Sequence, residues 1–308
     1  MPGGSANAPL HHYTYFYPYF DRSRSPDFEI PGMEGGTEGE YLTDRLTEET
    51  ISWLSNYSGQ KPFFLYLSHY AVHTPLEAPE GLVQKYEEKL NRDGSQISAV
   101  YGAMVENLDA NVGRVLSSLD DLGLSDNTIV VFTSDNGGTT RATNNAPLRE
   151  GKGYLYEGGI RVPLIVRWPG YVAAGSSTDT PAISYDILPT VLELVSAAPL
   201  RNANLDGRSL APVLTGSGSL ETRPLYWYYP HYSPQANRPG GAVRQGNLKL
   251  IETYDPAELE LFDLEHDLGE QHNLAADSAD VVERMRGQLQ QWLLQVNAKL
   301  HRPNPGKK

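Results

Sequence analysis

Cysteine is absent from this 308-residue sequence. The chain therefore has no disulfide bond, no thiolate metal site and no thiol nucleophile. It also lacks any run that approaches the roughly 20 apolar residues of a membrane span. Its opening, MPGGSANAPLHHYTYFYPYF, has no basic region followed by an apolar core, so we expect neither a signal peptide in this chain nor a membrane partner.

Basic residues are few, since 25 Lys and Arg stand against 38 Asp and Glu and the net charge is −13. Nucleic acids recruit basic surfaces, so we expect no nucleic-acid partner. An anionic substrate would need cations placed locally. At this length, with 39% hydrophobic residues, the chain can bury one large core and a smaller one.

Short apolar runs alternate with a helical pattern over the first two thirds of the chain. The runs Phe63–Leu67, IVVFT and PLIVR have the continuous apolar character of strands that are buried on both faces. Between the first two lies ISAVYGAMVENLDANVGRVLSSLDDLG, which repeats apolar residues at helical spacing. Strand, helix and strand in this order predict an α/β fold with a mostly parallel central sheet.

From about Glu221 the pattern changes to short alternating strands separated by turns, in RPLYWYYPHY and GGAVRQGNLKLIETYDPAELELFDLEHD. This pattern predicts a small antiparallel sheet. A final helix within DSADVVERMRGQLQQWLLQVNAKL should pack against that sheet. We therefore expect two domains, residues 1–215 and residues 216–308.

Asp135 and Asn136 follow the apolar run IVVFT, and His73 follows the earlier run. Ligand groups gather beyond the carboxyl ends of strands in open parallel sheets, so these side chains could face one crevice. Carboxylate and amide oxygens suit a hard cation, Ca²⁺ or Mg²⁺. Gly137 and Gly138 would let the backbone turn sharply behind the ligands. The alternative is an ordinary Asx-turn that closes a strand.

Two more side chains are candidates for contact with a substrate. Lys152 lies between two glycines, where a lysine can approach an anion closely, although a solvated loop lysine fits the same pattern. His231, in an aromatic cluster, could line a substrate pocket or stand at its rim. His69 and His73 have the four-residue spacing of zinc-binding histidines, but the glutamate of that motif is missing, and we expect no zinc.

Several ordered segments together resemble the type I sulfatases: KPFFLYLSHYAVHTPLEAP, YGAMVENLDANVGRVLSSLDDLGLSDNTIVVFTSDNGG, LREGKGYLYEGGIRVPLIVRWPG and the C-terminal GNLKLIE and LELFDLEHDLGEQHNLA. The resemblance implies an alkaline-phosphatase-like sandwich, a bound Ca²⁺ and hydrolysis of sulfate esters. It implies that Asp135 and Asn136 are metal ligands and that His73 and Lys152 contact the sulfate. The implied partner is a sulfated small molecule or a sulfated glycan, and the implied location is periplasmic or secreted.

The sequence also departs from that family. The family nucleophile is a formylglycine made from a Cys/Ser-x-Pro-x-Arg motif, and no such motif occurs here. The N-terminal Asp-Asp metal pair of that family and its Gly-Lys-x-His segment are absent too. We expect a sulfatase that lacks its first third, with an incomplete Ca²⁺ site and no activity as the chain stands.

Two alternatives to a sulfuric ester hydrolase remain open. One is a non-catalytic protein that keeps an anion-binding cleft for sulfated glycans. The other is a phosphodiesterase or phosphonate hydrolase, because related enzymes share the scaffold and much of the cation site.

Overall fold

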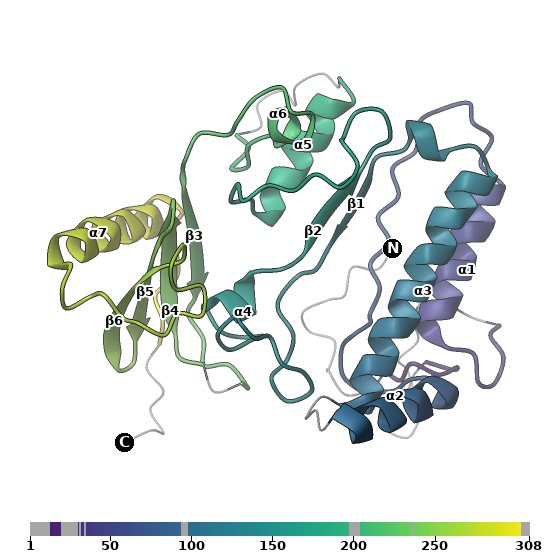
Figure 1. Cartoon of the computed structure of the whole chain (residues 1–308), viewed down its shortest axis with the longest axis horizontal. Helices are drawn as coiled ribbons and strands as arrows, with labels where there is room; N and C mark the ends of the chain where they lie inside the picture. Colours follow the sequence, from purple (N-terminus) through teal and green to yellow (C-terminus); the bar gives the residue numbers. More distant parts are fainter. Residues whose placement is uncertain are drawn as a thin grey trace. The chain divides into compact units, whose positions relative to one another are not determined.

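The structure, a computed structural model, describes residues 13–19, 30, 32, 33, 35–93, 98–196, 204–235 and 237–302 (Figure 1). The chain divides into two compact units, Met1–Thr128 and Ile129–Lys308, and each is described by itself. Within the described ranges, no helix is both long enough and apolar enough to cross a membrane.

The first unit is helical. Its helices are α1 (Leu42–Ser55), α2 (Glu80–Asp93), α3 (Ala99–Asp121) and the short η1 (Ser125–Asn127). The helical spacing in the sequence predicts α3, which begins after Ser98, whose hydroxyl accepts a hydrogen bond from the Tyr101 amide. Helices α1 and α3 lie side by side (Figure 1). Their shared core includes Leu42, Leu46 and Met104, and it is completed by buried tyrosines of the preceding segment, Tyr15, Tyr19 and Tyr41.

The predicted strand Phe63–Leu67 is wrong. The segment is irregular, and no strand of the described residues pairs with it. Phe64 is 81% exposed and Tyr66 is 70% exposed, so the run is not buried on both faces. An apolar run shows that a segment could form a buried strand. The strand forms only where a second segment supplies the partners for its backbone hydrogen bonds.

The second unit begins with a two-stranded ribbon. Strand β1 (Val130–Thr133) pairs with β2 (Leu164–Arg167) in antiparallel orientation, with Val131 opposite Val166. The mostly parallel central sheet that the sequence predicts is therefore not formed by the described strands. A parallel return needs a crossover that is usually a long helix, whereas the connection here contains only α4 (Glu157–Ile160).

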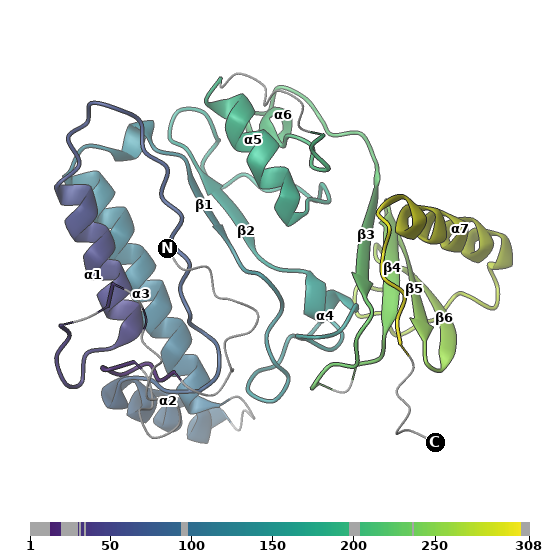
Figure 2. The same ribbon diagram turned by 180° about the vertical axis from the view of Figure 1, so that it is seen from behind.

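One face of this ribbon is covered. Helix α5 (Ile187–Leu194), which follows η2 (Ser184–Asp186), and helix α6 (Ala211–Leu214) lie beside β1 and β2 (Figure 2). A small apolar cavity separates the layers, and its walls include Val131, Val166 and Val191. The opposite face carries Phe132 and Ile165, which are 37% and 59% exposed.

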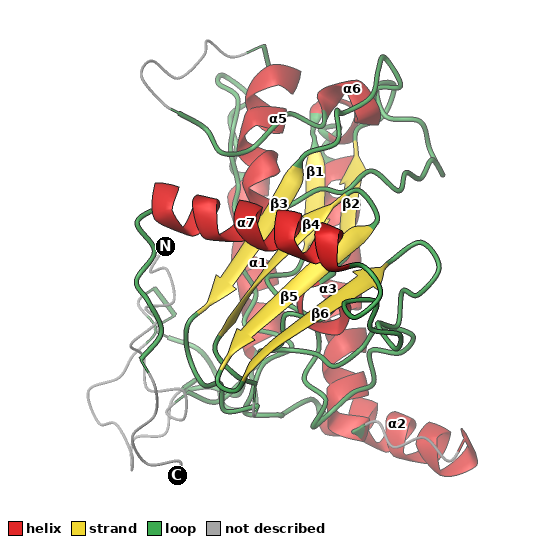
Figure 3. Cartoon of the chain, turned by 90° about the vertical axis from the view of Figure 1, so that its left-hand side faces the viewer, coloured by secondary structure: helices red, strands yellow, loops and turns green. Residues whose placement is uncertain are grey.

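The second unit ends in a four-stranded antiparallel sheet and a helix, as the sequence predicts. The strands, in spatial order, are β3 (Pro224–Tyr229), β4 (Gly240–Gln245), β5 (Leu248–Tyr254) and β6 (Ala257–Asp263). Helix α7 (Ala279–Gln295) lies across one face of the sheet (Figure 3).

Alternating side chains give this sheet two covered faces. Val243, Leu250 and Leu261 pack against Met285 and Leu289 of α7. The intervening side chains point the other way, and they pack against Leu155 rather than against a helix. This second cluster consists of Leu155, Ala242, Ile251, Phe262 and Leu264. The loop that contains Lys152 therefore covers the second face of the sheet.

Candidate functional site

The turn that carries Asp135 and Asn136 begins two residues after β1 ends. The hydroxyl of Thr133 donates a hydrogen bond to the Pro163 carbonyl oxygen at 2.9 Å, and the hydroxyl of Ser134 donates to the Asn136 carbonyl oxygen at 3.0 Å. The Gly137 amide donates to the Gly159 carbonyl oxygen at 3.0 Å. The turn is thereby attached to the chain that leads into β2.

Lys152 lies in a closed loop, residues 149–159, which we call the lysine loop. The ends of the loop meet because the Gly158 amide donates to the Arg149 carbonyl oxygen at 2.8 Å. The Lys152 amide donates to the Gly138 carbonyl oxygen at 3.0 Å. The Asn145 side chain donates to that same oxygen at 2.9 Å and to the Glu150 carbonyl oxygen at 3.0 Å. The structure therefore brings the Asp135–Asn136 turn and the lysine loop together.

Glycine allows this close approach of two backbones. A Cβ atom at Gly137 would lie 1.7 Å from the Gly158 carbonyl oxygen, and one at Gly151 would lie 2.2 Å from the Gly138 carbonyl oxygen. The sequence suggests a sharp turn at Gly137 and Gly138, but neither has the positive φ that Gly153 has, at +91°. The glycines are therefore needed because they have no side chain, which lets the backbones of the turn and the lysine loop come into contact.

Asp135 and Asn136 offer two oxygen atoms to a cation. The Asn136 amide nitrogen donates to the Gly137 carbonyl oxygen at 2.9 Å, which leaves its side-chain oxygen available. The Asp135 carboxylate is exposed and has no hydrogen-bond or ion-pair partner in the described part of the chain. Hard oxygen donors fit Ca²⁺, but this ion takes six to eight ligands, so the two side chains make up only part of a site.

His73 belongs to the first unit, where tyrosines surround it. Its amide donates to the Tyr15 hydroxyl at 3.1 Å, and its Nδ1 lies 3.1 Å from the Tyr13 hydroxyl and 2.8 Å from the Thr74 carbonyl oxygen. Because a carbonyl oxygen only accepts, Nδ1 carries the proton and Nε2 is left for a ligand. Burial raises the pKa of Tyr13 to about 12, so this hydroxyl stays protonated at neutral pH.

His69, the other histidine of this segment, is a neutral buried side chain. Burial lowers its pKa to about 4. Neither ring nitrogen has a hydrogen-bond partner among the described residues. One group of potential metal ligands lies elsewhere, where side-chain atoms of Asp263, Glu265 and His266 are within 4.8 Å of one another. The ion pair with Asp263 raises the pKa of His266, so the imidazolium competes with a cation there.

His231 follows β3 and is exposed, with its ring edge-on to Tyr229 at 5.6 Å between centroids. The segment after it is attached to the lysine loop. The Tyr154 hydroxyl donates to the Gln235 carbonyl oxygen at 2.6 Å, and a Cβ at Gly153 would lie 3.0 Å from the Ser233 hydroxyl oxygen. His231 thus lies in a segment that contacts the loop of Lys152. The sequence alone does not single out Tyr154 or Gln235.

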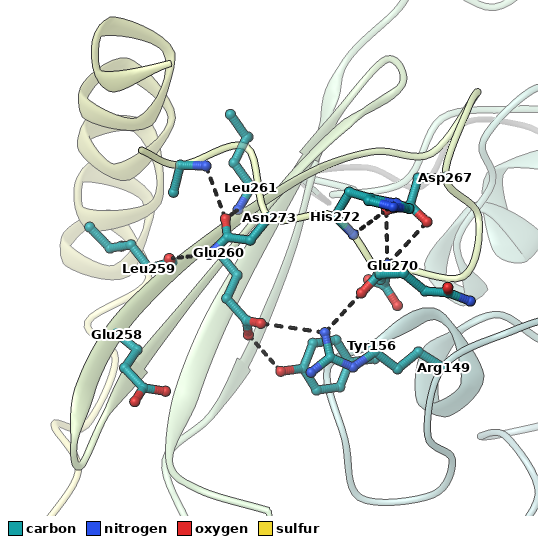
Figure 4. Close-up of polar contacts among 12 residues, drawn as sticks. Arg149, Tyr156, Glu258, Leu259, Glu260, Leu261, Asp267, Glu270, His272 and Asn273 are labelled. Carbon is teal, nitrogen blue, oxygen red and sulfur yellow. Dashed lines mark hydrogen bonds and ion pairs between the residues drawn. The ribbon is translucent and has the colours of Figure 1, made fainter. Parts of the chain in front are cut away.

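Arg149 connects the start of the lysine loop to the C-terminal sheet (Figure 4). Its guanidinium lies over the Tyr156 ring, 3.8 Å from the centroid, and donates to the Glu270 carbonyl oxygen at 2.9 Å. The Tyr156 hydroxyl donates to the Glu260 carboxylate at 2.5 Å, and Arg149 lies 3.4 Å from that carboxylate. Burial and then the Glu260 hydrogen bond raise the pKa of Tyr156.

Comparison with protein families gives two matches. The sulfatase family matches residues 3–197. The family described as N-sulphoglucosamine sulphohydrolase, C-terminal, matches residues 151–299. The second match includes residues 151–159 of the lysine loop and the whole four-stranded sheet that the loop covers.

Curated relatives include a sulfatase of Formosa agariphila, which is 35% identical over 293 residues, with 87% of this chain and 53% of the relative covered. Human arylsulfatase A is 35% identical over 267 residues, with 77% of this chain and 50% of the relative covered. The chain therefore spans about half the length of these relatives.

Solved structures share the fold. The crystal structure of Ps i-CgsB in complex with k-i-k-neocarrahexaose has a TM-score of 0.76 at 28% identity, with 91% of this chain and 64% of that chain covered. The structure of BT4656 in complex with its substrate D-glucosamine-2-N,6-O-disulfate has a TM-score of 0.67 at 21% identity, with 84% and 70% covered. The latter likeness shows the fold alone.

Proposed function

The chain belongs to the sulfatase family, and from this premise we propose that it supplies part of the active site of a sulfuric ester hydrolase. One observation carries the proposal: the Lys152 amide bonds to the Gly138 carbonyl oxygen at 3.0 Å, two residues beyond Asn136. In this proposal the turn that binds a cation and the loop that carries the Lys152 ammonium are held together by backbone hydrogen bonds. A protein with a net negative charge needs such local cations to bind an anion.

Each side chain has a defined task in this proposal. Lys152 offsets the charge on the non-bridging sulfate oxygens. Asp135 and Asn136 would hold a Ca²⁺, and such an ion supplies further charge stabilisation when bound. His73 acts as the imidazolium, in which Nε2 also carries a proton; it gives that proton to the departing oxygen and is left neutral, with its remaining proton on Nδ1. His231 borders the part of the substrate beyond the sulfate group.

The residues of this chain do not include the nucleophile. No Cys/Ser-x-Pro-x-Arg motif occurs in the sequence, so the 308 residues alone should not turn over a sulfate ester. In this proposal residues 1–215 are the catalytic part and residues 216–308 the C-terminal subdomain. The substrate is a sulfated small molecule or sulfated glycan, in keeping with the relatives' names, and the site of action is the periplasm or the exterior.

The test is a chimera. A segment that carries the formylglycine motif of the family is joined to residues 1–308, and the fusion is produced together with the formylglycine-generating enzyme. Conversion of the motif is confirmed by mass spectrometry. We expect hydrolysis of 4-nitrophenyl sulfate, and loss of it in Lys152→Ala.

The other outcomes separate the alternatives. A converted, folded chimera that hydrolyses a phosphonate monoester but no sulfate ester would support the phosphonate hydrolase. A chimera without turnover of either substrate that still binds a sulfated oligosaccharide would support the non-catalytic protein.

A further inference from the structure

A buried triad of charged side chains lies where the lysine loop meets the C-terminal sheet. Lys249 of β5 donates to the Glu157 carboxylate at 2.9 Å and to the Glu270 carboxylate at 2.8 Å. Glu270 also accepts a hydrogen bond from the Glu157 amide at 2.6 Å. The exposed fractions of the three side chains are 0%, 2% and 0% in the order Lys249, Glu157 and Glu270.

The triad holds one end of the lysine loop, and Arg149 holds the other. Glu157 is the third-last residue of the loop and the first residue of α4. Arg149, the first residue of the loop, donates to the Glu270 backbone, so one turn of the C-terminal segment receives both ends. Lys152 lies between these two attachments and makes neither of them.

Stability alone does not account for three buried charges. Replacing a buried ion pair with apolar side chains is often neutral or stabilising, so such pairs are weak evidence of stabilisation, and in some proteins they fix a specific geometry instead. Glu270 and Glu150 have φ values of +52° and +59°, a left-handed conformation that is strained for residues other than glycine. Strain of this kind persists where the surrounding contacts determine the backbone, as in binding loops.

We propose that Lys249 is a positioning residue for Lys152. With Glu157 and Glu270 it fixes the lysine loop on the C-terminal sheet, so that the Lys152 ammonium is held ready for a sulfate group. Lys249 itself touches no substrate. The inference rests on the proposed contact between Lys152 and sulfate.

The experiment compares four forms of the 308-residue chain: the natural sequence, Lys249→Met, Lys152→Ala and Met285→Ala. Met285 is a fully buried residue of α7 that packs on the opposite face of the same sheet, so Met285→Ala weakens the packing of helix and sheet without touching the triad. Amide hydrogen exchange is measured by mass spectrometry over residues 149–159 and over β3–β6. Affinity for sodium sulfate is measured by calorimetric titration.

For Lys249→Met we expect exchange in the lysine loop to accelerate at least about tenfold, and sulfate affinity to fall on the order of tenfold, the usual size of a lost orienting contact. Met285→Ala should accelerate exchange in the sheet and leave the sulfate affinity of the folded protein unchanged. Equal sulfate affinity in Lys249→Met and the natural chain overturns the proposal. So does exchange that rises equally in both variants and in both regions, because the triad is then only structural.

Lys152→Ala separates this inference from the proposed function. If it leaves sulfate affinity unchanged, the proposed role of Lys152 fails, whatever Lys249→Met does. If Lys249→Met does not fold, Glu270→Gln replaces it, because glutamine keeps an oxygen for the Glu157 amide. The same selective loss in Glu270→Gln supports the proposal, and failure of both variants to fold overturns it.

Discussion

The two units treat their buried polar groups differently. In the first unit burial favours neutral side chains, since it lowers the pKa of His69 to about 4 and raises that of Tyr13, which contacts His73, to about 12. In the second unit the groups behind Lys152 are ionic, with Lys249 between Glu157 and Glu270. The first environment disfavours added charge, and the second holds a fixed positive charge between two carboxylates. In the function proposed above, the first unit supplies the proton donor His73 and the second unit supplies the fixed charge of Lys152.

The largest expected effect is on the stability of the second unit. Lys249→Met should lower the free energy of unfolding by about 3–5 kcal/mol, because it leaves the buried Glu270 carboxylate without a cationic partner in the described part of the chain, while Glu157 keeps Arg161 at 3.5 Å. The matched control is Arg238→Met, which removes an exposed pair with Glu258 on the same sheet and should cost no more than about 1 kcal/mol. Urea denaturation measures both. Similar losses in the two variants would mean that the buried ion pairs contribute no more to stability than an exposed pair does.

The first unit should instead be sensitive to acid. The folded pKa of His69 is below that of the unfolded chain, so the stability due to neutral His69 is fully present above about pH 6.5 and is lost as the pH falls toward 4. The full loss is on the order of 3 kcal/mol. If this histidine is responsible, the melting temperature of the natural chain should fall between pH 6.5 and 4, and that of His69→Leu should fall much less. A natural slope retained in His69→Leu would assign the acid sensitivity to other groups.

The smallest expected effect concerns calcium. With two side-chain oxygens where the ion takes six to eight, the 308-residue chain should bind Ca²⁺ only weakly. Calorimetric titration should therefore give little heat, and Asp135→Ala should remove what remains. Submicromolar affinity would contradict this account and would point to ligands beyond Asp135 and Asn136.

The sequence predicts the elements that depend on local pattern. Alternation in β3–β6 and helical spacing in α7 are local, and both elements are confirmed. Pairing is not local: the apolar run Phe63–Leu67 forms no strand, and β1 and β2 pair antiparallel because their direction depends on the connection between them.

The same distinction holds for the candidate site. The contact between the Asp135–Asn136 turn and the lysine loop joins segments that are close in sequence. The glycines in both segments are a sign in the sequence of a close approach between their backbones. In the triad, Glu157 lies 92 positions before Lys249 and 113 positions before Glu270. No short sequence motif can predict contacts between residues so far apart in the chain. The one visible signal of the triad is Lys249, a charged residue inside the apolar strand LKLIE. How His73 and Lys152 cooperate stays a prediction.

The most direct test of the two-unit account compares His73→Ala with Lys152→Ala in the formylglycine-bearing chimera, on 4-nitrophenyl sulfate and on an alkyl sulfate. Lys152→Ala should lower turnover of both substrates by a factor on the order of 10², because both develop the same charge on sulfate. His73→Ala should reduce turnover of the alkyl sulfate far more than that of 4-nitrophenyl sulfate, whose phenolate departs with little protonation. Equal losses on the two substrates in His73→Ala would contradict the account, because His73 would then bind sulfate without acting as the acid.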